Sequence, residues 1–255
     1  MWVLIIFIAI WYSSLFCQTF FQHRYAAHQA FTMNKFWERT FYIFTYLTQG
    51  SSYLSPRAYG IMHRMHHAYT DNEKDPHSPE YSRNMLQMMV RTKQIYSSIY
   101  KGEFEVEEQF TRNLPDWPAF DKWAHSTFSR ICWILGYTAI FLWLSPSLWW
   151  LLLLPVVIIM GPLHGAIINW FAHKYGYTNF KLKNTSQNLF SVDFLMLGES
   201  YHNNHHKSPT AINFGKRWHE VDPVYYVIRL LASLRVITLR IDKHKTKKTP
   251  DNWEA

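Results

Sequence analysis

Histidine is the residue type whose spacing points most directly to chemistry in this chain. The sequence has 14 histidines among 255 residues, and most of them fall in short groups. Two triples of the pattern His-x2-His-His occur at 63–67 and 202–206, and His23 and His28 form a pair ahead of them. Imidazole nitrogen is a good ligand for Zn, Cu, Fe and Ni, so these groups predict metal binding.

The spacing within each group predicts how its side chains point. Residues three and four apart share one face of a helix, so each triple is expected to point at one place. The triples consist of His63, His66, His67, His202, His205 and His206. Asn169 and His173, four apart, would also share a face. His23 and His28 lie about 140° apart on an ideal α-helix of 3.6 residues per turn. They would therefore flank a metal pair, or the helix would end between them.

Nine imidazoles, His173 included, exceed what one metal ion needs. A zinc site takes about four ligands, whereas nine nitrogens with a few oxygens suit two ions of coordination number five or six. Isolated histidines are more often surface or core residues. We therefore expect no ligation by the remaining five, which are His77, His125, His164, His219 and His244.

Three carboxylates lie close to the histidine groups in the sequence. Glu199 and His202 have the Glu-x-x-His spacing of carboxylate-bridged di-iron sites, but such sites need two of these motifs and only one is present. We therefore interpret Glu199 as a hydrogen-bond partner that orients an imidazole. Asp71 and Asp75 are candidates for the same role.

The elements that must position these groups include long apolar segments. Aromatic residues make up 18% of the chain and charged residues 17%, against about 25% charged residues in soluble proteins. We predict membrane spans at 1–22, 127–144 and 148–168. The first lacks the basic start and cleavage site of a signal peptide. The shorter apolar segments 41–54 and 84–100 are predicted to be interfacial or surface helices.

The polar blocks 55–125 and 174–255 follow the first and third spans and hold most of the Lys and Arg. The positive-inside rule predicts that this side is cytoplasmic and the N-terminus external. The net charge is +8, but the Lys and Arg residues are scattered between the apolar segments, so no nucleic acid partner is expected. Cys17 and Cys132 lie in apolar runs and predict no disulfide. The sequence thus predicts one domain, 1–255, an all-α multi-pass membrane protein with about three spans and a helical cytosolic cap.

The order of these motifs resembles the integral-membrane fatty acid desaturases, and most closely the acyl-CoA (delta-9, stearoyl-CoA type) branch. The resemblance lies in the first histidine pair, in HRMHHAYTDNEKDPHSP (63–79), in NWFAHKYG and in GESYHNNHH (198–206), and covers nearly the whole chain. It implies a di-iron centre at the cytosolic ends of the spans, with O2 reduced as an acyl chain in a bent tunnel loses two hydrogens. The implied ligands are the nine imidazoles, with Asn169 acting through a bound water.

Two features depart from the family pattern. The family usually has four spans, and three are expected here. An Arg-Asp pair that helps to hold CoA often precedes the second motif, and these positions are Ile61 and Met62. Acyl-CoA is the expected substrate, with an acyl carrier protein or a lipid headgroup as alternative carriers. Electrons are expected from a separate donor such as cytochrome b5 or ferredoxin, docked on the basic cytoplasmic face.

Two other functions fit parts of the pattern. A hydroxylase would use the same metal scaffold and the same first C–H step but deliver oxygen, and the spacing favours desaturation by analogy alone. A membrane metal carrier or haem protein would place polar residues along its spans or histidines on both sides. The histidines gather on one side here, which argues against that class.

Overall fold

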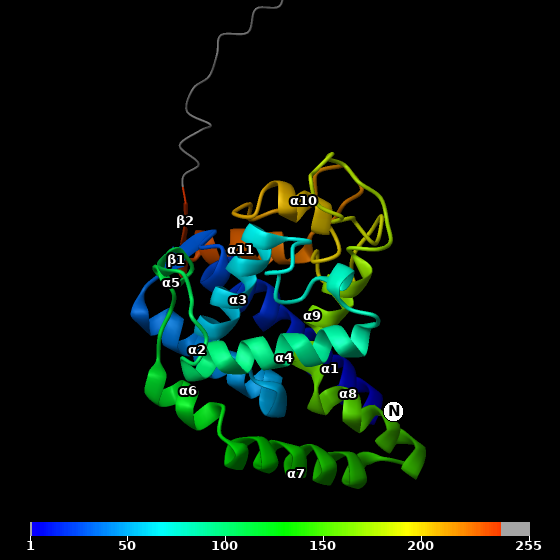
Figure 1. Cartoon of the computed structure of the whole chain (residues 1–255). Helices are drawn as coiled ribbons and strands as arrows, with labels where there is room; N and C mark the ends of the chain where they lie inside the picture. Colours follow the sequence, from blue (N-terminus) through cyan, green and yellow to red (C-terminus); the bar gives the residue numbers. More distant parts are fainter. Residues whose placement is uncertain (1, 241–255) are drawn as a thin grey trace, which may run out of the picture.

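The computed structural model describes residues 2–240, and its secondary structure is mostly helical (Figure 1). His244 and the rest of the expected cap beyond 240 lie outside the described residues. The first half contains α1 (Trp2–Cys17), η1 (Gln18–Ala27), β1 (Phe31–Met33), α2 (Lys35–Gln49), η2 (Gly50–Ser52), α3 (Pro56–Tyr69), η3 (Pro79–Tyr81), α4 (Met85–Lys101), α5 (Glu108–Thr111) and α6 (Pro118–Ala124). The second half contains α7 (Thr127–Leu144), η4 (Leu148–Leu153), α8 (Leu154–Ile158), α9 (Met160–Phe171), α10 (His202–Lys207), α11 (Pro223–Ser233) and β2 (Ile237–Leu239).

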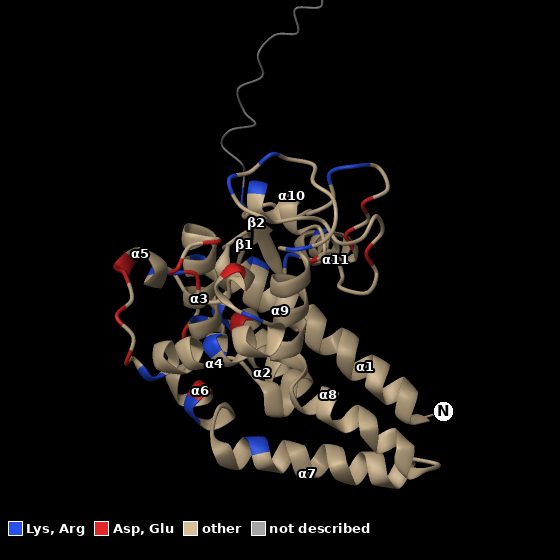
Figure 2. Ribbon diagram, turned by 45° about the vertical axis from the view of Figure 1, so that its right-hand side comes forward, with Lys and Arg blue, Asp and Glu red and all other residues tan. Residues whose placement is uncertain are grey.

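Two helices in the described chain are long and apolar enough to cross a membrane. They are Trp2–Ala27, which joins α1 to η1, and Thr127–Leu144. The segments Leu148–Ile158 and Met160–Phe171 pass the same test together but meet at an angle of 71°, so they count as a third span if the bent pair is one. The expectation of an all-α membrane protein with about three spans is confirmed at this level. Figure 2 shows charged residues gathered on the cap and nearly absent from the ribbons of α1, α7 and α8.

The break between α8 and α9 is held by serines from η2. The hydroxyl of Ser51 donates to the carbonyl of Ile158 at 2.9 Å. The N–H of Gly161 donates to the hydroxyl of Ser52 at 3.0 Å. A Cβ on Gly161 would lie 2.9 Å from the carbonyl oxygen of Ser52, so glycine is required for this approach. Broken spans are tolerated where neighbouring groups satisfy the freed backbone in this way.

The predicted surface helix 84–100 is present as α4, and the one at 41–54 corresponds to α2, which begins earlier, at Lys35, and ends at Gln49. Each begins at an asparagine cap, because the side chains of Asn34 and Asn84 accept from the backbone N–H three residues on. α2 buries Tyr42 and leaves apolar side chains on its other face, which are Phe36, Ile43, Phe44 and Leu47. This two-sided pattern is typical of a helix that lies at a membrane surface.

The second polar block is less helical than predicted. Residues 172–201 contain no helix or named strand, and isolated bridges join Asn188 to Tyr177 and to Tyr201. At the other end of the cap, β1 pairs antiparallel with β2, with Phe31 opposite Leu239. Strands of three residues are too short to be predicted from a sequence pattern. Their pairing joins the segment after His28 to the last described residues of the chain.

Candidate metal centre

His23 and His28 come together because the helix that carries them changes its winding. Residues 18–27 form a π-helix, and the N–H of His28 donates to the carbonyl of His23, five residues back, at 3.1 Å. In a π-helix, residues five apart lie nearly above one another. The two ring centroids are 4.9 Å apart. The first expectation from the ideal α-helix is therefore wrong, because the pair does not flank the site but lies in one group. The second is confirmed, because the helix ends at Ala27 and His28 is its C-cap.

The two triples each divide between two groups of imidazoles. One ligand atom from each member of a group lies within 4.8 Å of every other. The five-histidine group contains His23, His28, His63, His67 and His205. The four-histidine group contains His66, His173, His202 and His206. Each triple gives its i and i+4 members to one group and its i+3 member to the other. The expectation that a triple points at one place is wrong. On a helix, the side chains of residues i+3 and i+4 are turned to opposite sides of the direction in which residue i points.

The ring nitrogens within each group are spaced as metal ligands would be. In the five-histidine group, the Nε2–Nε2 distances between nearest neighbours run from 2.8 Å (His67 to His205) to 3.0 Å (His23 to His205), and all members lie within 4.8 Å of one another. In the four-histidine group the distances between nearest neighbours run from 3.0 to 3.2 Å. Ligands about 2.1 Å from a metal lie about 3.0 Å apart at right angles but about 3.4 Å apart in a tetrahedron. The spacing fits two ions with more than four ligands each.

The predicted carboxylates lie behind these rings. Glu199 approaches Nδ1 of His23 at 2.6 Å, and Asp75 approaches Nδ1 of His66 at 3.0 Å. Asp71 lies 3.4 Å from Nδ1 of His173. A carboxylate at this position fixes the ring and leaves Nε2 free to ligate.

A buried arginine supports the first of these carboxylates, and no sequence pattern predicted this contact. Arg24 is fully buried. It pairs with Asp222 at 2.7 Å and donates to Thr19, whose hydroxyl in turn donates to Glu199. One cation thus sits with two carboxylates beside the five-histidine group. The excess negative charge would stabilise a cation bound there.

Six of the grouped imidazoles disfavour a proton and so are available to a metal. Burial, followed by the charge of neighbouring imidazoles, holds the pKa well below the ordinary value for His63, His66, His67, His202, His205 and His206. A buried ring that cannot take a proton keeps its lone pair for a metal ion.

Two histidines expected to be ordinary are buried without a hydrogen-bond partner among residues 2–240. His77 is 2% exposed, both its ring nitrogens lack a hydrogen bond, and its ring lies 4.3 Å from that of His66. Burial lowers the pKa of His77 to about 3. His164 is also buried with both nitrogens unpartnered, edge-on to Trp11. His125 stacks on Tyr100 with ring centroids 4.0 Å apart.

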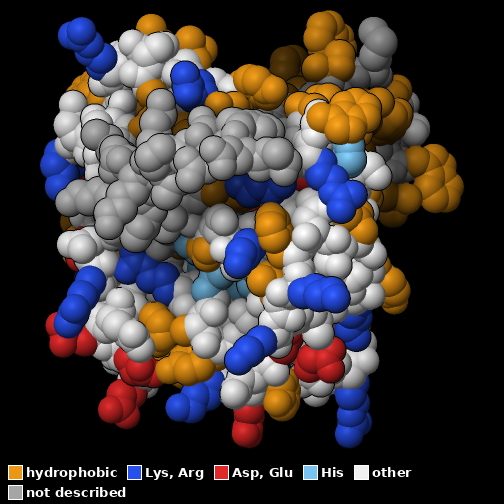
Figure 3. Space-filling model, turned by 90° about the horizontal axis from the view of Figure 1, so that it is seen from above, with side chains coloured by type: hydrophobic (Ala, Val, Ile, Leu, Met, Phe, Trp, Pro, Cys, Tyr) orange, Lys and Arg blue, Asp and Glu red, His pale blue; other side chains and the backbone are white. Residues whose placement is uncertain are grey.

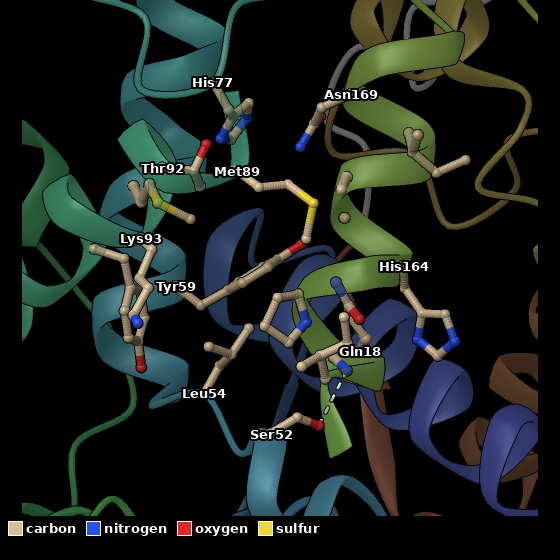
Figure 4. Close-up of a pocket in the computed structure, with 18 of the residues that line it drawn as sticks. Gln18, Ser52, Leu54, Tyr59, His77, Met89, Thr92, Lys93, His164 and Asn169 are labelled. Atoms are coloured by element: carbon tan, nitrogen blue, oxygen red, sulfur yellow. Dashed lines mark hydrogen bonds between the residues drawn. The ribbon is translucent and has the colours of Figure 1, made fainter. Parts of the chain in front are cut away.

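A cavity of about 590 Å³ adjoins both groups. His23, His63 and His202 lie in its wall, and α4 and α9 contribute apolar side chains such as Leu86, Met88, Met89, Ala166 and Ile168. Figure 4 shows His77 and Asn169 in the wall, from opposite sides of the cavity. No contact joins Asn169 to a ring of either group within the described residues, so its ligation through water stays a prediction. The volume and lining suit an apolar ligand.

A second, smaller depression opens on the cap. It has a volume of about 290 Å³ and is lined by His28, Arg64 and Arg112 among others. Figure 3, which views the molecule from the cap, shows histidine at the base of a hollow with Lys and Arg around it. The five-histidine group is therefore approached from two sides, one apolar and one basic.

Known proteins of one family are similar to this chain over most of its length. The family model described as fatty acid desaturase matches residues 1–239. The chain is 29% identical to the delta-9 desaturase-like 2 protein of Arabidopsis thaliana, over 91% of this chain and 75% of that protein. It is 26% identical to the delta-9 acyl-lipid desaturase 2 of the same plant, over 90% and 74%. It is 25% identical to the chloroplastic palmitoyl-monogalactosyldiacylglycerol delta-7 desaturase, over 85% and 56%. The chain belongs to the fatty acid desaturase family.

Proposed function

We propose that this protein introduces a double bond into a fatty acyl chain at a di-iron centre, with O2 as co-substrate. Membership of the family supports fatty acid desaturation. The observation that carries the di-iron proposal is the pair of imidazole groups in the wall of one apolar cavity. The proposed ligands are His23, His28, His63, His66, His67, His173, His202, His205 and His206, with Asn169 through a water.

Bound iron would supply the oxidising power needed to remove hydrogen from an unactivated methylene. The chain's own residues do the rest. Glu199 and Asp75 hold the rings of His23 and His66 in orientation. The apolar wall binds the acyl chain beside the rings and excludes water from the reacting carbons. Because the wall fixes how far the chain advances, it determines which bond is attacked.

The residues at positions 61 and 62 do not support the expected binding of CoA. Ile61 and Met62 are 5% and 6% exposed and pack in a core cluster with Tyr96 and Ile99 of α4. Uncharged, buried side chains there offer nothing to the phosphates of CoA. Acyl-CoA therefore rests on the sequence resemblance alone, and lipid-linked substrates appear in the names of two relatives.

A separate electron donor would dock over the smaller depression. Arg64 binds the carbonyls of Ala26 and Ala27 behind His28, so its charge is fixed at this point. Arg112 lies beside it and is exposed, with Glu108 as its ion-pair partner. A basic patch above a ligand histidine suits an acidic redox protein, such as cytochrome b5 or a ferredoxin.

Arg112→Ala tests the docking site. We expect a higher KM for the reduced donor, little change in kcat, and a weaker dependence of the rate on ionic strength. Arg83→Ala, an exposed arginine outside this depression, is the matched control. Equal KM values in the two variants would place the donor elsewhere.

We further propose that the protein is a multi-pass membrane protein with the site on the cytoplasmic side. The candidate spans and the charged cap support this orientation. Thiol labelling tests it: a cysteine introduced at exposed Trp218 on the cap should react with an impermeant reagent only from the cytoplasmic side. Reaction from the outer side of sealed cells would invert the topology.

Product analysis separates desaturation from hydroxylation, which the same scaffold would support. Purified protein reconstituted with iron, reduced donor, O2 and an acyl substrate should give a product lighter by two hydrogens. A product heavier by one oxygen would favour the hydroxylase. Less than about one iron per chain after reconstitution, with His63→Ala and His202→Ala no different from wild type, would reject the metal centre itself.

A further inference from the structure

The cavity beside the imidazole groups is open along one side. Leu86 and Val90 of α4 line it, as do Arg130 of α7 and Ile159 at the break between α8 and α9. Leu86, Val90 and Ile159 are 70%, 49% and 45% exposed. Residues that both line a cavity and face outward mark the place where it meets the surface. We call the edge formed by Leu86, Val90, Lys93, Arg130 and Ile159 the lateral opening.

The lateral opening lies between helices that would be in the membrane. Arg130 is in the first turn of α7, and Ile159 divides the bent span. α4 closes the third side with Leu86, Met89 and Val90, which recur at helical spacing. An opening toward water would carry polar side chains at the exposed positions of Leu86, Val90 and Ile159. Exposed apolar side chains between two candidate spans fit contact with lipid tails.

The lateral opening also carries two positive charges that no carboxylate balances. Lys93 is exposed and makes no hydrogen bond or ion pair within residues 2–240. Arg130 donates to the backbone carbonyls of Ser51, Tyr53 and His125 and keeps its charge. The acidic residue of the cavity lining is Glu199, at the far end beside His23. Cations near the ends of spans suit the phosphate of a membrane lipid.

We propose that the acyl chain enters this cavity sideways from the bilayer while still esterified to a glycerophospholipid, whose phosphate lies at Lys93 and Arg130. The chain then extends from the lateral opening toward His63 and His202. This inference rests on the proposed function for the fate of the chain, but lipid binding needs neither iron nor O2. CoA also carries phosphate, so the test separates the two carriers.

Photolabelling in a CoA-free system provides the test. Purified full-length protein is placed in liposomes that contain phosphatidylglycerol with a photoreactive diazirine in its acyl chain. Lipid-facing helices will be labelled in any case, so the informative sites are Tyr59 and Met62 in the inner cavity wall. We expect label on both after illumination. Label from a diazirine acyl-CoA and none from the lipid would overturn the proposal.

Variants at the lateral opening sharpen the result. Val90→Trp should block the opening and abolish the inner label while label on α7 remains. Gln94→Trp, on an exposed residue of α4 outside the cavity lining, is the control. Lys93→Gln should lower inner labelling about fivefold, as expected for one basic residue near an anionic lipid. A neutral galactolipid probe with the same chain should label less than phosphatidylglycerol.

The outcomes separate this inference from the proposed function. Inner label that is equal in Val90→Trp and Gln94→Trp, or equal from the galactolipid, would reject lateral entry of a phospholipid. Inner label that depends on Val90 while no double bond forms during turnover would uphold lateral entry and count against desaturation. Thermal melts of the two tryptophan variants, expected to match, exclude misfolding as the cause.

Discussion

Glu199 and Asp75 provide a test of how nine imidazoles divide between two metal ions. Glu199 contacts His23 in the five-histidine group, and Asp75 contacts His66 in the four-histidine group. Glu199→Gln and Asp75→Asn keep the shape of each side chain and remove its charge. Each variant should therefore weaken one ion and leave the other in place.

The structure sets the size of each effect. Loss of a carboxylate behind a ligating histidine costs about 10- to 100-fold in metal affinity, or about 1.4–2.7 kcal/mol. Glu199→Gln should lie at the upper end, because its contact is the shorter one and the buried pair of Arg24 and Asp222 is then left without excess negative charge. Asp75 also accepts from the N–H groups of Asp71 and His77, so Asn at this position keeps part of the geometry.

Graded chelation measures these affinities. Iron retained per chain is followed as chelator is added to the wild type, to each variant, and to Glu38→Gln. Glu38 is a buried glutamate that contacts Tyr25 and Lys35 and no imidazole, so its variant should match the wild type. In the other variants, about half of the iron should leave at a lower chelator concentration.

The double variants decide whether the division is right. In a His28→Ala background the five-histidine ion is already weakened, so Glu199→Gln should add little and Asp75→Asn should add its full effect. If Asp75→Asn and Glu199→Gln were equally non-additive with His28→Ala, all three would act on one ion. The two groups described above would then be incorrect.

Other consequences concern stability. Ser52→Ala should cost about 1–3 kcal/mol, because the buried N–H of Gly161 loses its acceptor, while Ser147→Ala at an exposed turn should be neutral; melting temperatures in detergent measure both. Burial lowers the pKa of His125 to about 4. As pH falls below about 6.5, the unfolded chain takes up a proton at this position that the folded chain refuses. Wild type should therefore lose more stability than His125→Phe between pH 6.5 and 4 in parallel melts. Equal losses in the two proteins would contradict the lowered pKa of His125. Removing bound metal should lower the melting temperature. When the free metal concentration was 100 times Kd, the free energy of unfolding should fall by about 2.7 kcal/mol.

The sequence predicted the metal-binding groups but not how they are shared. Helical spacing predicted that each triple points at one place, whereas the structure gives the i+3 member of each triple to the other group. The division between ions depends on how α3 and α10 face each other, and that is set by tertiary packing. Glu199, Asp71 and Asp75 were found because they lie within or close to the histidine motifs.

Contacts between residues far apart in the chain could not be predicted from local sequence patterns. Arg24 and Asp222 are 198 residues apart, and a single arginine beside a histidine does not indicate a buried ion pair. The loop at 172–201 was predicted as part of a helical cap, yet it is fixed by backbone bridges to Asn188. Spans and surface helices were predictable because hydrophobic length and periodicity are local properties.

The π-helical turn between His23 and His28 links the winding of the backbone to occupancy of the site. A wider turn is uncommon in a membrane helix and has little stability of its own. Returning it to α-helical winding would rotate one ring away from the other, so an ion that binds both rings holds the turn in its wider form. Iron binding and the helical conformation of this turn would then be coupled. Isotope-edited infrared spectra of the backbone carbonyl of His23 would therefore report iron occupancy without observing the metal.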